Sequence, residues 1–215
     1  MSTDVVIVGC SGHGREVYSI VQAVNETGAR QEAVRVLGFV DDAPSERNLK
    51  LVQRLDVAYL GRVDWLRTAP AGTHVLLGLG HPGVRQRLGR RIDGYGLPAF
   101  SVVHPDATVG RDLVHGEGLV VFPGARVTTN VTLGRHVHLN QNATVGHDSV
   151  LEDYVSVNPS AAVSGDCHLA EAVLIGTCAA VLQGRRVGPG ATVGASACVV
   201  RDVPDGTVVK GVPAR

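Results

Sequence analysis

A histidine followed by an aspartate, His147-Asp148, is the first place in this chain of 215 residues where chemistry could occur. A neutral imidazole can take up a proton near pH 7. A neighbouring carboxylate favours the charged form of the ring and so raises its basicity. These two properties would allow His147 to act as a general base. A histidine on a solvated surface is more often inert, so the pair alone leaves both interpretations open.

The second place is the glycine-rich turn at residues 9–14, Gly-Cys-Ser-Gly-His-Gly, which follows an apolar run and opens a helical pattern. Backbone N–H groups and the positive end of a helix dipole would make such a turn an anion site. Asp41-Asp42 closes the next apolar run, where a carboxylate can meet a ribose or sugar hydroxyl. The spacing G-x-x-G-x-G differs from the dinucleotide pattern G-x-G-x-x-G, so a nicotinamide enzyme is the weaker hypothesis. A tight turn without a ligand is the other alternative.

Other polar residues give weaker signals. His136 and His138 are two residues apart, but no carboxylate or cysteine cluster accompanies them, so we expect no metal site. Four basic residues late in the chain would be solvated or would meet the phosphates of a cofactor: Arg185, Arg186, Lys210 and Arg215.

Strand and helix patterns alternate over residues 1–100, the segment that must position the glycine turn. Short β-branched runs predict buried parallel strands, and apolar residues at helical spacing predict amphipathic helices. The strands are expected at 4–8, 34–40, 57–61 and 73–78, and the helices at 15–25, from 63, and at 82–94. This alternation predicts a small Rossmann-like α/β domain with a parallel sheet and right-handed crossovers.

A six-residue repeat occupies the rest of the chain and must position His147. Steps of six from Val103 to Val199 meet only valine, leucine or isoleucine, apart from His115. Four residues after each step comes a small or aliphatic residue, as at Ala125 and Ala143. This period is typical of a hexapeptide parallel β-helix over residues 101–215. We expect the α/β domain to cap its front and the tail at 205–215 to cover its far end.

The composition excludes several classes of protein. Lys+Arg and Asp+Glu are equal at 20 each, and aromatic residues make up 4%, which argues against nucleic-acid binding. No apolar run is long enough to span a membrane, and the first residues lack the features of a signal peptide. No C-x-x-C pair occurs, so we expect reduced, buried thiols of a cytoplasmic protein at Cys10, Cys167, Cys178 and Cys198.

The motifs of the two halves together resemble one family. They are SGHG at 11–14, GFVDD at 38–42, TVGHDSV at 144–150, the hexapeptide domain and the closing VVKGVPAR at 208–215. They resemble the hexapeptide-repeat sugar acetyltransferases, which include bacterial nucleotide-aminosugar N-acetyltransferases and sialic-acid O-acetyltransferase relatives. The resemblance implies that the β-helix is left-handed.

The resemblance also implies roles for particular residues. His147 would be the general base that takes a proton from the sugar as it attacks acetyl-CoA, and Asp148 would raise its basicity. Relatives often carry a histidine where this chain has Ser156. Five residues would line the acetyl-CoA site: Asn140, Ser156, Gly165, Thr177 and Ala195. Six would contact the nucleotide sugar: Gly12, His13, Gly14, Asp41, Asp42 and Gly61.

The function that the resemblance implies is acetyl-CoA-dependent N-acetylation of a nucleotide-linked 4-amino-4,6-dideoxy sugar. The transfer would be direct and need no metal, since holding the amine and the thioester in line supplies much of the rate. Homotrimers with active sites between subunits are also implied. Two alternatives stay open: an O-acetyltransferase acting on a sialic acid or other sugar hydroxyl, and a non-catalytic β-helix protein that binds a nucleotide sugar.

Overall fold

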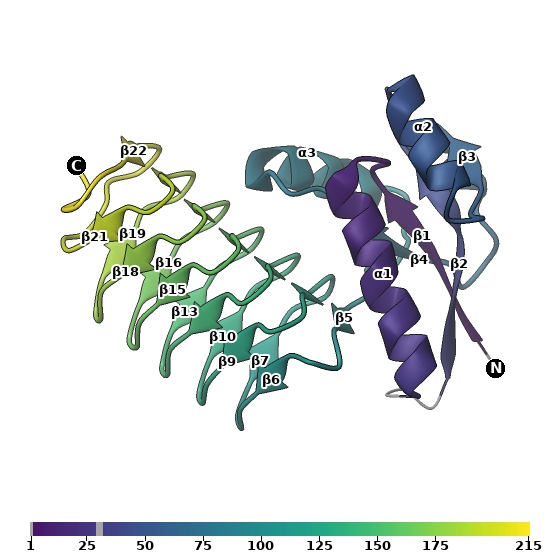
Figure 1. Cartoon of the computed structure of the whole chain (residues 1–215). Coiled ribbons are helices and arrows are strands. Elements are labelled where there is room, and N and C mark those ends of the chain that lie inside the picture. The colour runs from purple at the N-terminus through teal and green to yellow at the C-terminus, as the bar shows by residue number, and fades with distance from the viewer. Residues whose placement is uncertain (1, 29–31) are drawn as a thin grey trace.

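The computed structural model describes residues 2–28 and 32–215 and contains the two expected architectures, a small α/β domain and a parallel β-helix (Figure 1). The α/β domain has a four-stranded parallel sheet in the order β3-β2-β1-β4. Its strands are β1 (Ser2–Val8), β2 (Ala33–Val40), β3 (Tyr59–Gly61) and β4 (His74–Leu77). Its helices are α1 (Gly12–Thr27), α2 (Glu46–Gln53), the 3-10 helix η1 (Val63–Thr68) and α3 (Pro82–Asp93).

Burial of apolar faces explains these elements. The end of β1 is fully buried, as expected for a strand covered on both faces. Helix α1 buries Val17, Ile20, Val21 and Val24 at helical spacing. It begins at Gly12, three residues earlier than the sequence pattern predicted, so the second half of the glycine turn is its first helical turn. The parallel sheet therefore gathers its turns along one carboxyl edge.

Two-residue strands form three faces of a triangular prism in the β-helix. The β5 face contains β5 (Val102–Val103), β8 (Val120–Val121), β11 (His138–Leu139), β14 (Ser156–Val157), β17 (Leu174–Ile175), β20 (Thr192–Val193) and β22 (Val208–Val209). The β6 face contains β6 (Thr108–Val109), β9 (Arg126–Val127), β12 (Thr144–Val145), β15 (Ala162–Val163), β18 (Ala180–Val181) and β21 (Cys198–Val199). The β7 face contains β7 (Val114–His115), β10 (Thr132–Leu133), β13 (Val150–Leu151), β16 (His168–Leu169) and β19 (Arg186–Val187).

The predicted aliphatic column fills the centre of the prism. Its members from Val121 to Val199 are buried, and the small residues four positions later pack against them. The tail adds β22 beside β20, and the Ala214 N–H donates to the Cys198 carbonyl, so the chain end lies across the last coil.

The front of the β-helix is capped only in part, which corrects the expectation from the sequence. Val109 and Val114 in the first coil are 41% and 64% exposed. The α/β domain packs mainly against the outside of the β5 face, where Val102, Val120 and Phe122 join the core of α1. Outward residues of that face are apolar here, so this flank is buried instead.

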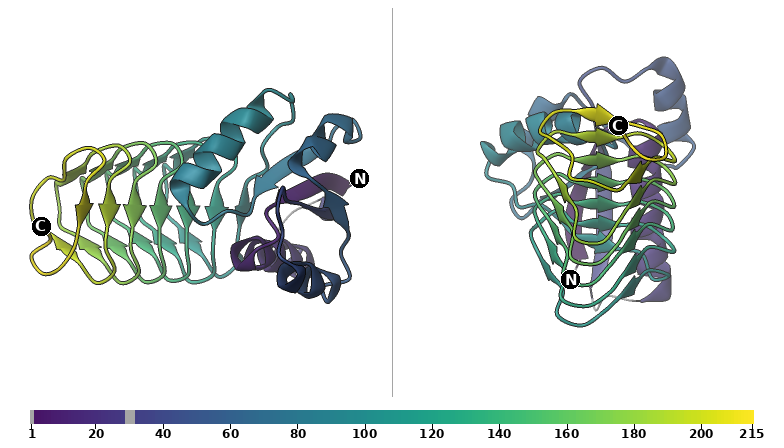
Figure 2. Two further views of the ribbon diagram at one scale, coloured as in Figure 1. Left: turned by 90° about the horizontal axis from the view of Figure 1, so that it is seen from above. Right: turned by 90° about the vertical axis from the view of Figure 1, so that its left-hand side faces the viewer.

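Helix α3 lies along the β-helix (Figure 2) and connects the two domains through its side chains. Its Arg85 is fully buried and donates to the carbonyls of His136, Tyr154 and Val155 in the β-helix. It also donates to the carbonyls of Leu79 and Gly80 in the turn before α3. A forked guanidinium suits such a set of acceptors. This contact joins the end of β4 to successive coils.

The thiols follow the expectation only in part. Cys10 and Cys167 are buried, Cys198 is half-buried and Cys178 is exposed. Cys178 adopts a left-handed backbone conformation at a corner between coils, with φ of 57°, and this turns its side chain outward. No helix of the described residues is long and apolar enough to cross a bilayer.

Candidate active site

His147 and Asp148 form a close pair at the corner between β12 and β13. The Nδ1 atom of His147 lies 2.7 Å from Oδ2 of Asp148, and both side chains are about half exposed, at 52% each. The Nδ2 atom of Asn130, one coil earlier, donates to the same carboxylate over 3.1 Å. The hydrogen bond from His147, and then that from Asn130, lower the pKa of Asp148. An ionised Asp148 can only accept, so His147 carries its proton on Nδ1 and leaves Nε2 free to take up another.

The backbone of this corner suits the residues that the sequence supplies. Asp148 has φ of 60°, in the left-handed region. The equivalent corner positions in neighbouring coils hold Asn130, Asp166 and Gly184, all with positive φ. Asparagine, aspartate and glycine tolerate that region best. The repeat therefore places a carboxylate beside His147 at little conformational cost.

Gly165 lies against the His147 ring from the next coil. A Cβ atom at Gly165 would sit 2.5 Å from Cε1 and Nε2 of the imidazole, closer than real Cβ atoms approach. Only glycine therefore lets the ring keep this position. The structure brings together three of the residues that the sequence singled out: His147, Asp148 and Gly165.

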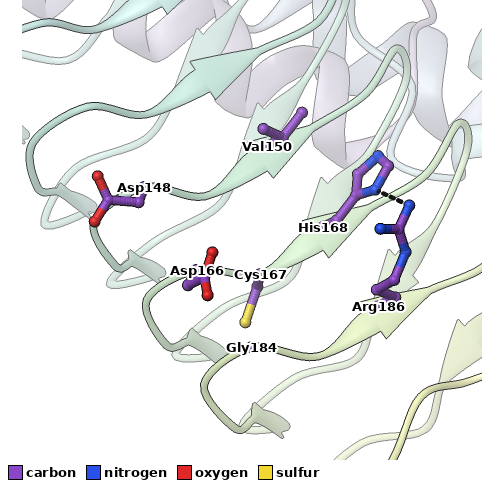
Figure 3. Close-up of a pocket in the computed structure, with 7 residues that line it drawn as sticks. All are labelled: Asp148, Val150, Asp166, Cys167, His168, Gly184 and Arg186. Atoms are coloured by element: carbon purple, nitrogen blue, oxygen red, sulfur yellow. Dashed lines mark hydrogen bonds between the residues drawn. The ribbon is translucent and has the colours of Figure 1, made fainter.

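An open groove of about 340 Å³ runs from Asp148 over the next two coils (Figure 3). Arg186 donates to Nδ1 of His168, which requires the His168 proton on Nε2, where it meets Glu152 over 2.6 Å. Sequence reasoning missed Asp166 and His168, although both lie eighteen residues after groove positions, Asp148 and Val150. The groove is lined by Asp148, Val150, Asp166, Cys167, His168, Gly184 and Arg186.

Three other residues expected to line the acetyl-CoA site lie at a different corner, between the β5 and β6 faces. Thr177 and Ala195 are exposed there, on successive coils. Asn140 is 5% exposed and donates from Nδ2 to the Val157 carbonyl over 3.0 Å. Within one chain these residues do not join His147, which lies at the corner between the β6 and β7 faces.

Ser156, which was expected to line the acetyl-CoA site, lies away from the groove at Asp148 within one chain. Its side chain is fully buried on the β5 face beneath α3. Its hydroxyl accepts from Arg85 over 2.8 Å and donates to the Gly80 carbonyl over 3.1 Å. Both hydrogen-bonding directions are thus used inside the chain, so a bound molecule has no access to this oxygen.

The residues expected to contact a nucleotide sugar gather at the carboxyl edge of the sheet. Gly14 packs so tightly that a Cβ atom there would meet the Gly9 carbonyl oxygen at 2.0 Å. Asp41 accepts from the backbone N–H of Cys10 over 2.8 Å, which ties the ends of β1 and β2 together. The Asp41 N–H donates to the carbonyl of Gly61, whose φ is 121°. Gly12 is exposed at the start of α1.

Asp42 lies at the same edge and is held there by the guanidinium of Arg91. Its Oδ2 accepts from Nη1 of Arg91 over 2.6 Å, and its Oδ1 accepts from the Val63 N–H. Partial burial opposes ionisation, but the hydrogen bonds from Arg91 and Val63 prevail and lower the pKa of Asp42. The carboxylate is therefore charged and oriented, with part of its surface open.

His13 points from this edge into the domain interface. Its Nε2 shares a hydrogen bond of 2.9 Å with Nδ1 of His138 on β11. Burial, with a smaller effect from Arg85, lowers the pKa of His13 to about 4, so the ring is neutral at physiological pH. In the described ranges, no group of three histidine, cysteine, aspartate or glutamate side chains is arranged to hold a metal ion.

His147 and the carboxyl edge of the sheet face apart within one chain. The α/β domain covers the β5 face, through contacts at His138, Ser156 and the neighbouring corner. His147 lies between the other two faces, at the edge of the prism opposite the β5 face. A molecule bound at the carboxyl edge of the sheet thus lies away from His147 of the same chain.

Known proteins resemble this chain in both domains. A family model described as the PglD N-terminal domain matches residues 4–92. The solved structure of PerB from Caulobacter crescentus, in complex with CoA and GDP-perosamine, is 29% identical with a TM-score of 0.87, covering 99% of this chain and 96% of that one. The acetyltransferase domain of PglB from Neisseria gonorrhoeae, in complex with acetyl coenzyme A, is 29% identical with a TM-score of 0.85, covering 100% and 99%.

WeeI from Acinetobacter baumannii is 26% identical with a TM-score of 0.82, covering 98% of each chain. A perosamine N-acetyltransferase from Caulobacter crescentus has also been solved with one histidine replaced by asparagine or by alanine. No curated protein matches the chain in sequence.

The α/β domain, the left-handed hexapeptide β-helix and the histidine–aspartate corner define a two-domain hexapeptide-repeat transferase. More specifically, the chain is similar over nearly its whole length to hexapeptide-repeat sugar acetyltransferases, the family that its motifs resemble.

Proposed function

We propose that this protein transfers the acetyl group of acetyl-CoA to the amino group of a nucleotide-linked 4-amino-4,6-dideoxy sugar. The observation that carries the proposal is the His147–Asp148 pair, in which Nδ1 of His147 contacts Asp148 over 2.7 Å and Asp148 lines an open groove. The likeness to structures solved with CoA and GDP-perosamine supports the two substrates. In this proposal residues 1–100 bind the nucleotide sugar and residues 101–215 bind acetyl-CoA and carry the base.

The His147 pair can serve a direct transfer. As the sugar nitrogen attacks the thioester carbonyl, a C–N bond forms, and Nε2 of His147 takes the proton that the amine loses. Asp148 stabilises the resulting imidazolium through Nδ1. The C–S bond then breaks, and the CoA thiolate leaves and takes that proton. Holding the two substrates in line supplies much of the remaining acceleration. We also propose that the enzyme is cytoplasmic, because it depends on a supply of acetyl-CoA.

The geometry supports a site that is shared between subunits. Since the carboxyl edge and His147 face apart in one chain, a sugar bound at that edge reaches a base only from a neighbouring copy. Thr177 and Ala195, at another corner from His147, would likewise meet the groove of a neighbour. We therefore include a homotrimer, with acetyl-CoA lying between subunits, in the proposal.

The test is an assay of thiol release with acetyl-CoA and UDP-, dTDP- and GDP-linked 4-amino-4,6-dideoxy sugars. We expect His147→Ala to lose at least about 100-fold in turnover, the range typical of a general base. His115→Ala, an exposed histidine of the first coil, is the matched control and keeps its activity. The proposal fails if no amino sugar releases CoA above the His147→Ala background.

The same assay separates the alternatives. Release of CoA with a free sialic acid, and not with the amino sugars, would point to an O-acetyltransferase. The absence of a thermal shift with acetyl-CoA would point to a non-catalytic sugar-binding protein.

A further inference from the structure

Two histidines from different domains meet in a buried hydrogen bond. His13 belongs to the glycine-rich turn and His138 to β11, and the distance from Nε2 of His13 to Nδ1 of His138 is 2.9 Å. Their rings stack with centroids 5.2 Å apart. His138 is fully buried, and its Nε2 has no hydrogen-bond partner among the described residues. Among the residues that the structure describes, the His138 ring therefore hydrogen-bonds with His13 alone.

Both rings are neutral, so one of the two must donate in this bond. Burial lowers the pKa of His13 to about 4 and that of His138 well below the usual value. A neutral imidazole has one N–H and one lone pair. The direction of the bond consequently decides which nitrogen of His13 carries its proton.

The surroundings favour donation by His138. The Glu16 carboxylate lies 3.8 Å from Nδ1 of His13, which favours a proton on that nitrogen. The Nε2 atom of His13 is then an acceptor, and His138 donates from Nδ1. The reverse direction would leave an N–H of His138 buried without an acceptor, and orphaned N–H groups are rare in proteins. Arg85 adds a positive charge nearby, which also favours a lone pair over an N–H at Nε2 of His138.

We propose that His138 is a positioning residue, which holds His13 as the Nδ1–H tautomer so that the glycine-rich turn offers a neutral N–H donor to an uncharged oxygen of a ligand. The side of the ring that carries Nδ1 faces Gly80, where a Cβ atom would approach that nitrogen to 3.6 Å. An N–H at this position, with the Glu16 carboxylate 3.8 Å away, suits an uncharged oxygen acceptor such as a hydroxyl or carbonyl oxygen better than an anion. That the ligand is a nucleotide-linked sugar rests on the proposed function.

The tautomer can be measured without any ligand. In protein labelled with ¹⁵N-histidine, long-range ¹H–¹⁵N correlation spectra distinguish protonated from unprotonated ring nitrogens. We expect His13 to show a protonated Nδ1 and an unprotonated Nε2 in the wild type. The variant His138→Asn keeps a donor near the position of Nδ1 and preserves this pattern, whereas His138→Leu removes the donor and loses it. A wild-type His13 protonated at Nε2 would overturn the proposal.

Kinetics provide the second measurement, with GDP-perosamine and acetyl-CoA as probes. In His138→Leu we expect the KM for the nucleotide sugar to rise on the order of 10-fold, as for the loss of one hydrogen bond. The KM for acetyl-CoA stays within about twofold, and His138→Asn restores the sugar KM. Equal effects of the two variants would show a merely structural role and overturn the proposal. If no sugar is turned over, the proposed function fails while the spectra still decide the tautomer.

Discussion

Asp148 occupies a corner position that the fold reserves for residues able to adopt positive φ. Equivalent corners hold Asp112 and Asn130, so a carboxylate here is locally inexpensive whether or not it has a function. What sets Asp148 apart is its contact with His147, over 2.7 Å, and the histidine's contact with Gly165. The contact between Asp148 and His147 thus depends on a left-handed corner conformation that recurs throughout the domain.

Asp148→Asn tests the charge at this position. The amide oxygen can still accept from Nδ1 of His147, so the geometry is kept and the negative charge is lost. Because the pKa of Asp148 is lowered, the wild type keeps this charge into the acidic range. We expect turnover to fall on the order of 10-fold and the acid limb of the pH–rate profile to move to lower pH.

Asp112→Asn is the matched control for that experiment. Asp112 has the same left-handed conformation two coils earlier and is exposed. Its pH–rate profile overlays that of the wild type. An unchanged profile in Asp148→Asn would remove the carboxylate from the mechanism.

At the scale of elements, α3 determines how the two domains meet. The buried Arg85 satisfies carbonyls from both domains, and no carboxylate among the described residues pairs with it. Burial lowers the pKa of Arg85 to about 9. Arg90 and Asp93 add exposed ion pairs to Glu171 and Arg135 along the same flank. Exposed pairs of this kind contribute little, so the buried contacts dominate.

Gly89 and Gly83 give a matched pair of substitutions within α3. A Cβ atom at Gly89 would meet the Tyr154 hydroxyl at 2.7 Å, whereas one at Gly83 would meet only the His81 ring at 3.5 Å. Alanine favours a helix over glycine by up to about 1 kcal/mol. We expect Gly83→Ala to stabilise the protein slightly and Gly89→Ala to destabilise it by about 1–3 kcal/mol, as overpacking does. Urea unfolding measures both; equal effects would mean that α3 does not pack closely on Tyr154.

The sequence predicts the elements more reliably than their contacts. The valine, leucine and isoleucine column identifies the β-helix because each position repeats within six residues, and His147-Asp148 is a neighbouring pair. The burial of Ser156 could not be predicted because its partner, Arg85, lies 71 residues away and no local pattern indicates the contact. The same holds for Val102 and Val120, whose outward burial depends on α1. A periodic pattern shows which residues share a face, but it does not show which distant segments pack together.

For the whole molecule, buried histidines at the domain interface imply sensitivity to acid. Burial lowers the pKa of His13 and of His136 to about 4, below the unfolded value of about 6.5. Between these values the unfolded chain binds protons that the folded chain does not. Stability therefore falls as the pH falls from about 6.5 to about 4, by about 1.4 kcal/mol per pH unit for each histidine. Urea unfolding at several pH values measures this slope.

His136→Asn is the control for the acid sensitivity. His136 has φ of 55°, which asparagine tolerates, and asparagine does not titrate. We expect this variant to reduce the slope of stability against pH by one proton. An unchanged slope would show that His136 is not kept neutral by the fold.

If the active site is shared between subunits, activity should return when two different inactive variants are combined. His147→Ala removes the proposed base, and Asp41→Ala removes a carboxylate that orders the carboxyl edge. If the base and the edge come from neighbouring subunits, mixed trimers contain sites with neither change. We therefore expect activity to return when the two variants are unfolded and refolded together, and not when each is refolded alone. Continued inactivity of the mixture would place both groups in one subunit's site.

The register of the β-helix has a consequence for how such a chain can change length. From β5 and β8 to β18 and β21, every strand pairs with the one that lies eighteen residues further on. Duplication of any eighteen-residue unit beyond Asp166 would add a coil while each existing residue kept an equivalent neighbour. Loss of a single residue would instead turn every later inward side chain outward. The β-helix can therefore change its length only by gaining or losing whole coils.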